Sequence, residues 1–504
     1  MWRVPVAVLS VLVAGCSAHG SAAPGPADSG PGEDAAEAGN ATLSALTVST
    51  GTLRPAFDPN TTDYDVTALN SVYPISITAT TTDPSGTLTI LGAPAQSGAP
   101  STLTLQPKQD MTVVVSEAGL TPTTYTVHYV PSDLPPYTVT QSASQGTENV
   151  LIVPQGQYLL IVDRAGDPIY YRTFLPDDVD DFQQITLPDG TIQYSAAVGI
   201  FDPSGWTLGV DHLMDDHFND LGDYQPLAYA QHGAEPAESH EFLVLGPDHF
   251  VVMSYVQRTL DLSTINPAWS AQAVVMSGLF QEIQSGQVLV EWDSANVPSL
   301  YSDSLFENQF GPIGTSGVND YLHLNSIDVD PSDGNFIVSF RHTSSIVKID
   351  RHTAQILWTL GGKEDQYGLS GTQVFSFQHY VKMRPDGSMT IFDNGYSPVA
   401  GTGHPTRILQ LTLDQTAHQV TSFNVLYTKP DGQPQTTFMG SDALLSGGRL
   451  FCGWGGWYTT GLAPAATEII NGSPVWSLEL QTPGYFSYRA QPVATLSGSA
   501  DGGM

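Results

Sequence analysis

Three histidines stand at equivalent places in successive segments of the chain. His240 begins HEFLVLGPDHFVV, His323 begins HLNSIDVDPSDGNFIVSF, and His379 begins HYVKMRPDGSMTIF, so each precedes a turn of Pro, Asp or Gly. In a radially repeated β architecture, equivalent positions of different repeats converge on the central channel. The three imidazoles are therefore predicted to face one another in one pocket, where a neutral imidazole could attack an anionic substrate.

Two further polar residues accompany His323. Asn325 lies two residues later, so on a strand its side chain would share the face of His323. Arg341 ends the following strand, in IVSFRHTSS, and can return to the channel. A guanidinium holds a sulfate or phosphate ester through paired charge-assisted hydrogen bonds. The set predicts an ester-binding pocket beside a histidine nucleophile.

Metal binding is the main competing chemistry, because three histidines could ligate zinc or copper. No His-x-His or His-x3-His pair supplies a local clamp, and a neighbouring arginine is electrostatically unfavourable beside a dication. The chain also lacks a Gly-x-Ser-x-Gly motif and a phosphate-binding Gly-Lys-Ser/Thr loop. We therefore predict no metal and no cofactor.

The elements that position these residues repeat along residues 137–495. Turns recur at an interval of about 58 residues, and each is followed by an outer strand pair with a turn of its own. The inner turns are Pro154-Gln155-Gly156, Asp189-Gly190, Pro247-Asp248, Asp333-Gly334, Asp386-Gly387 and Gly447-Gly448. No unit has a helical period, and two stacked sandwiches would not explain the shared phase of the turns. The pattern predicts an all-β chain whose main domain is a six-bladed β-propeller.

A second, smaller β domain is predicted at residues 40–131. Thr- and Val-rich alternation in several short strands indicates a small β-sandwich. The stretch LSALTVSTGTLRPAFDPNTTDYDV resembles bacterial cadherin-like β-sandwich repeats. It contains no Asp-x-Asp calcium ligands, so we expect a spacing or adhesive role. A stiff linker, PSDLPPY, joins it to the propeller.

The first sixteen residues are typical of a lipoprotein signal. Arg3 precedes an apolar run, which ends in Val13-Ala14-Gly15-Cys16, so Cys16 is the predicted lipidation site. Residues 17–39 are rich in Gly, Ala, Ser and Pro and are predicted to be a disordered tether. Ser17 follows the cysteine, which favours an exported lipoprotein of the outer membrane. The only other cysteine, Cys452, is expected to be a small buried hydrophobe.

The charge balance excludes two classes of partner. The chain has 50 acidic and 16 basic residues, a formal net charge of -34. So acidic a surface repels nucleic acid and anionic headgroups, and neither is an expected partner beyond the lipid anchor itself. No feature of the sequence indicates an oligomeric state.

Two long motifs carry a resemblance to a known family. HLNSIDVDPSDGNFIVSFRHTSSIVKIDRHTAQILWTLGGK at 323–363, followed by FSFQHYVKMRPDGSMTIFDNG at 375–395, resembles the bacterial arylsulfate sulfotransferases. These are exported six-bladed propellers that use no nucleotide sulfonate donor. The resemblance covers approximately residues 230–480.

The resemblance implies a role for each site residue. His379 would accept the sulfuryl group, and His240 would be the family's earlier site histidine. The family's sulfuryl-binding positions are occupied by His323, Asn325 and Arg341, and Asn394 in FDNG would support the site. The implied reaction is a ping-pong exchange through a sulfohistidine, from an aryl sulfate donor to a phenolic acceptor.

Two other functions remain open at this point. One is a non-catalytic surface propeller that binds a ligand or a protein partner, and the other is a histidine-ligated metalloenzyme. Turnover of an aryl sulfate that requires a phenol would separate the first from the sulfotransferase, and loss of activity with a chelator would identify the second.

Overall fold

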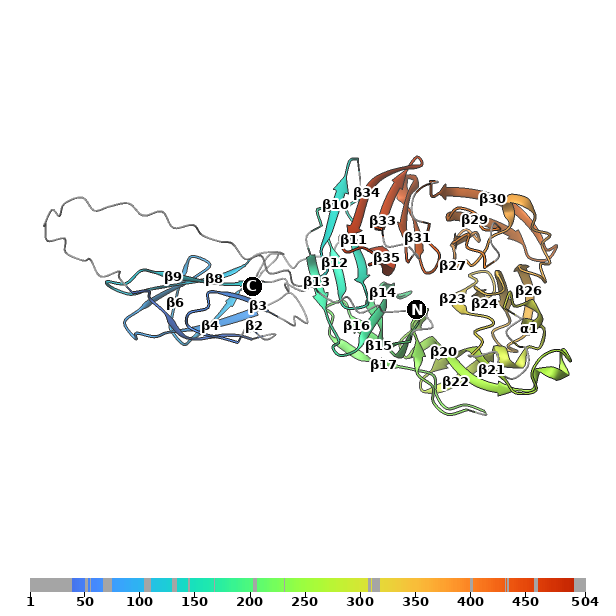
Figure 1. The fold of residues 1–504 in the computed structure, drawn as a ribbon, viewed down its shortest axis with the longest axis horizontal. Coiled ribbons are helices and arrows are strands. Elements are labelled where there is room, and N and C mark those ends of the chain that lie inside the picture. The colour runs from blue at the N-terminus through green and yellow to red at the C-terminus, as the bar shows by residue number, and fades with distance from the viewer. Residues whose placement is uncertain are drawn as a thin grey trace, which may run out of the picture.

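A computed structural model describes residues 39–493 except 50–52, 55, 67–74, 104–109, 129–133, 144–145, 167, 203–205, 231, 307–309, 311–317, 399–401, 431, 433–434 and 457–460. A small sandwich precedes a ring of six sheets (Figure 1). The predicted fold class, an all-β chain with a six-bladed propeller behind a β-sandwich, is confirmed. Cys16, the signal and nearly all of the tether lie outside the described residues.

The sandwich consists of two sheets whose inner faces alternate with outer ones. One sheet has the order β1 (Leu43–Val48), β4 (Ile75–Thr81), β7 (Pro100–Leu103). The other has the order β2 (Leu53–Arg54), β3 (Asp63–Val66), β9 (Thr123–His128), β8 (Met111–Ser116), β5 (Thr87–Ile90), β6 (Ala93–Ala95). Every second residue of β4 and β8 is buried, as the period of a strand requires.

Four blades each come from one continuous segment. Blade 2 has β14 (Asp178–Thr186), β15 (Ile192–Asp202), β16 (Trp206–Asp215) and β17 (Asp220–Tyr224), with β18 (Ala237–Glu238) beside β16. Blade 3 has β19 (Phe242–Gly246), β20 (His249–Leu260), β21 (Ala273–Gln284) and β22 (Gln287–Asp293). Blade 4 has β23 (Leu324–Val329), β24 (Phe336–Phe340), β25 (Ser345–Ile349) and β26 (Ile356–Gly361). Blade 5 has β27 (His379–Met383), β28 (Met389–Asp393), β29 (Arg407–Asp414) and β30 (Gln419–Thr428).

The other two blades close the ring with strands from both ends of the propeller. Blade 6 has β31 (Ser441–Leu445), β32 (Arg449–Gly453), β33 (Pro464–Ile470) and β34 (Ser473–Leu480), and β10 (Tyr137–Gln141) adds a fifth, outer strand. Blade 1 has the order β35 (Ser487–Val493), β11 (Asn149–Pro154), β12 (Leu159–Val162), β13 (Pro168–Arg172). The only α-helix of the described residues is the short α1 (Ser299–Asp303), and no described helix is long and apolar enough to cross a membrane.

The first blade begins at a different strand from the one that the turn pattern predicts. The turn at Gln155 and Gly156 joins β11 to β12, the second and third strands of blade 1, so its interpretation as an inner turn is wrong. The first strand of this blade is β35, where Asn149 pairs with Val493. The other five predicted turns do connect the first and second strands of their blades.

Aromatic side chains pack the blades against one another. The Trp292 ring of blade 3 stacks on Phe280 of the same blade and on Phe340 of blade 4, at centroid distances of 5.8 and 5.4 Å. Cys452 is fully buried beside Trp454, and burial raises the pKa of its thiol well above the usual range. The expectation that Cys452 is a buried hydrophobe is confirmed.

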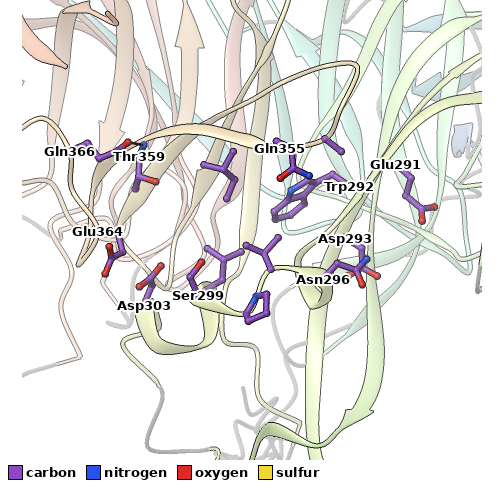
Figure 2. A pocket seen from close by; sticks show the side chains of 15 residues that line it. Glu291, Trp292, Asp293, Asn296, Ser299, Asp303, Gln355, Thr359, Glu364 and Gln366 are labelled. Atoms are coloured by element: carbon purple, nitrogen blue, oxygen red, sulfur yellow. Dashed lines mark hydrogen bonds between the residues drawn. The ribbon is translucent and has the colours of Figure 1, made fainter. Parts of the chain in front are cut away.

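A cavity of about 570 Å³ lies at the outer strands of blades 3 and 4, beside α1 (Figure 2). Its lining carries four carboxylates, those of Glu291, Asp293, Asp303 and Glu364. Two of them have structural partners: Glu291 contacts His232 at 2.7 Å, and Asp293 pairs with Arg258. So acidic a cavity is unsuited to an anionic ester, and none of the predicted site residues lines it.

The strand order makes a prediction about truncation. A chain that begins at Pro135 should fold, because it keeps β10, whereas a chain that begins at Gly146 loses the pairing of Tyr137–Gln141 with β34. Each lost backbone hydrogen bond costs about 1 kcal/mol, so the shorter chain should unfold at a lower temperature. Circular dichroism during heating measures the melting temperature of each shortened chain. Insolubility of the chain that begins at Pro135 would show instead that the sandwich is integral to the propeller.

Candidate active site

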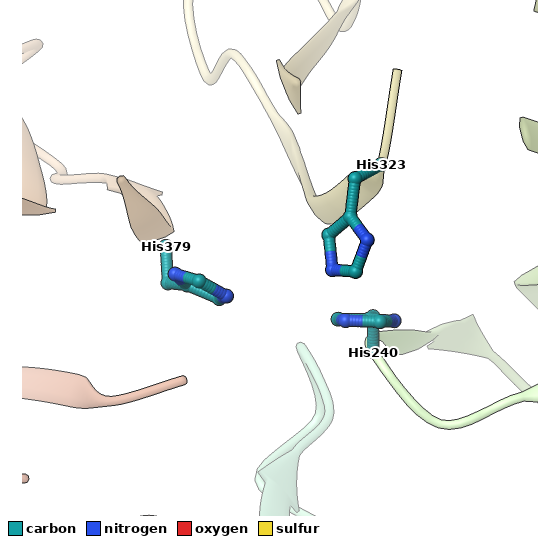
Figure 3. Close-up of side chains that lie close together, drawn as sticks. All are labelled: His240, His323 and His379. Atoms are coloured by element: carbon teal, nitrogen blue, oxygen red, sulfur yellow. The ribbon is translucent and has the colours of Figure 1, made fainter. Parts of the chain in front are cut away.

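The structure brings together the three predicted histidines from three adjacent blades. His240 lies two residues before β19, His323 directly before β23, and His379 at the first position of β27. Their rings point toward a common space (Figure 3), with ring centroids 4.8 Å apart for His240 and His323 and 6.4 Å apart for His323 and His379. All three are buried. The first strands of the blades therefore deliver three imidazoles to one point in the channel.

Each of these histidines has an acceptor at Nδ1. The Nδ1 of His379 lies 2.7 Å from Oδ1 of Asn394, and that of His323 lies 2.5 Å from Oδ2 of Asp320. The Nδ1 of His240 contacts Glu238. An amide oxygen accepts only, so Nδ1 of His379 carries the proton and Nε2 keeps its lone pair. The acceptors thus set the tautomer that a nucleophilic imidazole needs.

The lone pair of His379 is already in contact with a donor. The backbone N–H of Met439 donates to Nε2 over 3.1 Å, which fits an unprotonated nitrogen. Met439 has a positive φ of 63°, and His323 and Phe377 have φ of 54° and 55°. Left-handed backbone at residues other than glycine costs energy and gathers at functional sites. Three such residues around one imidazole indicate a site that the surrounding fold holds in place.

Burial keeps the imidazoles of His379, His323 and His342 neutral. Burial, followed by the nearby Arg341 charge, holds the pKa of His379 well below its usual range. Burial and the neighbouring His240 and Arg341 do the same to the pKa of His323. Burial also lowers the pKa of His342 to about 3. Neutral His379 is the form that could attack an electrophilic sulfur or phosphorus.

The guanidinium of Arg341 is held in a fixed orientation. Its Nη1 donates to Nε2 of His342 over 2.7 Å, its Nη2 donates to the Thr437 carbonyl over 3.2 Å, and it stacks 4.7 Å from the centre of the Phe377 ring. His342 is fixed in turn, because its Nδ1 donates to the Asp320 carbonyl over 2.6 Å. Burial of Arg341 among these partners gives a preorganised cation for an anionic group.

Asn325 has a different place from the expected one. Its Nδ2 donates to the Gln378 carbonyl over 2.8 Å, its side chain is fully buried, and its Oδ1 has no hydrogen-bond partner among the described residues. The simple alternation from His323 fails because that residue has a positive φ and the register shifts between Leu324 and Ser326. Asn325 supports the backbone that leads into His379.

Asn394 makes hydrogen bonds to two parts of the site. Besides accepting from His379, it donates through Nδ2 to the carbonyls of Thr436 and Met439, over 3.3 and 3.0 Å. The same amide therefore holds both the imidazole and the loop whose N–H reaches Nε2.

Three supporting residues were not predicted from the sequence: Glu238, Asp320 and His342. Glu238 accepts from the backbone N–H of His240 over 3.1 Å as well as from its ring. Asp320 serves His323 with its carboxylate and His342 with its carbonyl. The only sequence signal was proximity, since each lies within three residues of a predicted site residue.

Solved structures similar to this chain have low sequence identity. A Bacteroides caccae protein of unknown function is 13% identical, with 69% of this chain and 99% of that chain covered and a TM-score of 0.38. A quinonprotein alcohol dehydrogenase-like protein from Bacteroides thetaiotaomicron is 11% identical, with 88% and 99% covered and a TM-score of 0.36. The Cps50 (Swd1) β-propeller domain of Myceliophteria thermophila is 10% identical, with 69% and 90% covered and a TM-score of 0.36.

The family comparisons address the site directly. No curated protein matches the chain. Residues 220–457 match the model of the arylsulfotransferase (ASST) family, a span that contains all three histidines, Arg341 and Asn394. Residues 43–130 match the cadherin-like beta sandwich domain. The chain is therefore similar to the arylsulfotransferase (ASST) family over residues 220–457 and to the cadherin-like β-sandwich domain over residues 43–130.

Proposed function

We propose that the protein moves a sulfuryl group from an aryl sulfate to a phenolic acceptor by a ping-pong mechanism, with His379 as the covalent nucleophile. The observation that carries the proposal is the state of His379: its Nδ1–H is held by Asn394, its unprotonated Nε2 accepts the backbone N–H of Met439, and its ring points toward the other two histidines (Figure 3). The arylsulfotransferase family match at residues 220–457 supports the same reaction class.

In the first step, Nε2 of His379 attacks the sulfur and displaces the contact from Met439. The N–S bond forms while the S–O bond to the aryl group breaks, and the bonding pair leaves on the phenolate oxygen. The transition state is loose, with charge on three equatorial oxygens, so positioning and fixed positive charge dominate catalysis. Arg341 supplies that charge. A phenolate is a good leaving group, which favours an aryl over an alkyl ester.

In the second step, a phenol attacks the sulfohistidine, its proton passes to a base, and Nε2 of His379 is regenerated. His240 and His323 are the candidates for the acid of the first step and the base of the second. His240 is the better candidate, because the buried Glu238 contacts its Nδ1 and would stabilise the protonated ring.

Aromatic side chains around the histidines support a phenolic substrate. Trp206 lies 6.0 Å from His323, Tyr488 lies 5.8 Å from His240, and Phe377 stacks under Arg341, all measured to ring centroids. Aromatic rings of donor and acceptor could pack against such surfaces.

A chromogenic aryl sulfate tests the proposal. The protein should release the coloured phenol over many turnovers only when a second phenol is present, and the acceptor should gain the sulfate. If no coloured phenol is released with any acceptor, the non-catalytic surface propeller is favoured. If a chelator abolishes the release, a metalloenzyme is favoured.

Asn394→Ala should slow transfer by about 10²-fold, because the imidazole of His379 loses the acceptor that fixes its tautomer. Asn394→Asp keeps an acceptor and should retain more of the rate. The exposed Asn424, in the same blade, provides a matched control as Asn424→Ala. Steady-state rates and melting temperatures separate a catalytic effect from a loss of fold. Equal rates for Asn394→Ala and Asn424→Ala would exclude this role.

We also propose that the protein is an exported outer-membrane lipoprotein anchored through Cys16, with the sandwich as a spacer. The support is the signal-like sequence that ends at Cys16. Cys16→Ala should move the protein from the membrane fraction to the soluble fraction, whereas Cys452→Ala should not. A Cys16→Ala protein that stays with the membrane would refute the lipid anchor.

A further inference from the structure

We propose that His240, His323 and His379 also form a three-histidine site for a zinc-type divalent transition metal, and that metal bound there blocks sulfuryl transfer. The blocking rests on the proposed function, whereas the metal site does not. The absence of a local His-x3-His pair was a reason to predict no metal, but the channel supplies the clamp from three separate blades.

The geometry of the donors is close to that of a metal site. One ring nitrogen from each histidine lies within 4.8 Å of one from each of the others. Zinc binds imidazole nitrogen at about 2.0–2.1 Å, so small inward shifts of the rings would bring all three onto one ion. Three histidines and one open position are also a common ligand set of zinc proteins.

The hydrogen-bond partners of the three histidines are of the kind found around metal-binding histidines. Such a histidine almost always donates its other ring N–H to a carboxylate or a carbonyl, which orients the ring and makes the ligating nitrogen more basic. All three histidines do so here, toward Glu238, Asp320 and the amide oxygen of Asn394. The Nε2 atoms are the remaining ligand atoms, and a metal at Nε2 of His379 would displace the N–H of Met439.

The electrostatic objection from Arg341 is offset by nearby negative charge. A dication would face one guanidinium but two carboxylates, and Oε1 of the buried Glu238 has no hydrogen-bond partner among the described residues. The guanidinium itself is directed to His342 and the Thr437 carbonyl. Metal on Nε2 of His379 would occupy the lone pair that must attack sulfur.

One surface cluster is a rival for metal and serves as the control. Asp215, Asp216 and His217 also place three donor atoms within 4.8 Å of one another, but Asp216 and His217 are exposed. His217→Ala therefore removes the rival without touching the channel.

Titration of the chelator-stripped full chain with Co²⁺ alone tests the binding. The wild type and His217→Ala should each bind one tight equivalent with the visible absorption of four-coordinate Co²⁺, and Zn²⁺ should displace it. Glu238→Gln should bind about 10–100-fold more weakly, and His240→Ala more weakly still. Circular dichroism verifies that the variants fold. Asp320, His323 and His342 form another cluster of donors, which does not include His240. A wild type without this absorption, or binding that His240→Ala keeps at full strength, would therefore overturn the site.

The aryl sulfate assay tests the blocking separately. Zn²⁺ added to one equivalent should abolish transfer by the wild type and by His217→Ala, and a chelator should restore it. Full activity with the channel saturated by metal would refute the blocking. Tight Co²⁺ binding by a protein that has no transferase activity under any condition would support the metal site. It would refute the proposed function, and with it the blocking that rests on that function.

Discussion

His379→Asn is expected to abolish sulfuryl transfer while the propeller stays folded. Asparagine has no nucleophilic ring nitrogen, yet its Nδ2 can still donate toward Asn394 in place of the Nδ1–H of the imidazole. Loss of a covalent nucleophile reduces turnover by as much as about 10⁶-fold in well-studied enzymes. Turnover of a chromogenic aryl sulfate with saturating phenol measures the effect.

The exposed His352 provides the control for this substitution. It lies in an outer turn of blade 4, so His352→Asn should leave turnover unchanged. Melting temperatures of both variants should stay near that of the wild type. If His379→Asn turned over as fast as His352→Asn, another group would have to be the nucleophile.

Arg341→Lys is expected to cost about 2–4 kcal/mol of transition-state stabilisation, or roughly 30- to 10³-fold in kcat/KM. Lysine keeps the charge but cannot donate to His342 and the Thr437 carbonyl in one plane while it stacks on Phe377. The values of kcat/KM for the aryl sulfate donor measure the loss.

Arg351 offers a closely matched comparison in the same blade. Its guanidinium pairs with Glu282 through two nitrogens and stacks 5.4 Å from the centre of the Phe336 ring, away from the histidines. Arg351→Lys loses the same kind of fork and should affect stability without changing kcat/KM. Equal kcat/KM values for the two variants would mean that the fork of Arg341 does not contact the transferred group.

Local turn chemistry was enough to place five of the six blades. Five turns, from Asp189-Gly190 to Gly447-Gly448, join the first two strands of their blades. Gly and Asp favour these turns because they tolerate the backbone conformations of a tight turn. The closure could not be predicted in this way. The pairings of β10 with β34 and of β35 with β11 join opposite ends of the propeller, and no local pattern encodes such long-range pairing.

The candidate site was likewise predictable only in part. The shared phase of the repeats placed three histidines in one channel, since that placement depends only on blade symmetry. Asn325 could not be placed from strand alternation, because the positive φ of His323 and the shift after Leu324 interrupt the strand. Glu238 and Asp320 are acidic residues in an acidic chain, and their role appears only once the ring nitrogens they contact are known.

The most direct test of the sulfohistidine mechanism is the mass of the protein after the first half-reaction. Wild-type protein is mixed with an aryl sulfate, quenched before any phenol is added, and analysed intact and as peptides. The sulfohistidine mechanism predicts the added mass of one sulfuryl group at His379, labile in acid because the sulfur is bonded to nitrogen, and lost when phenol is supplied. An unchanged mass in a protein that turns over fully, or an adduct that persists in His379→Asn, would contradict it.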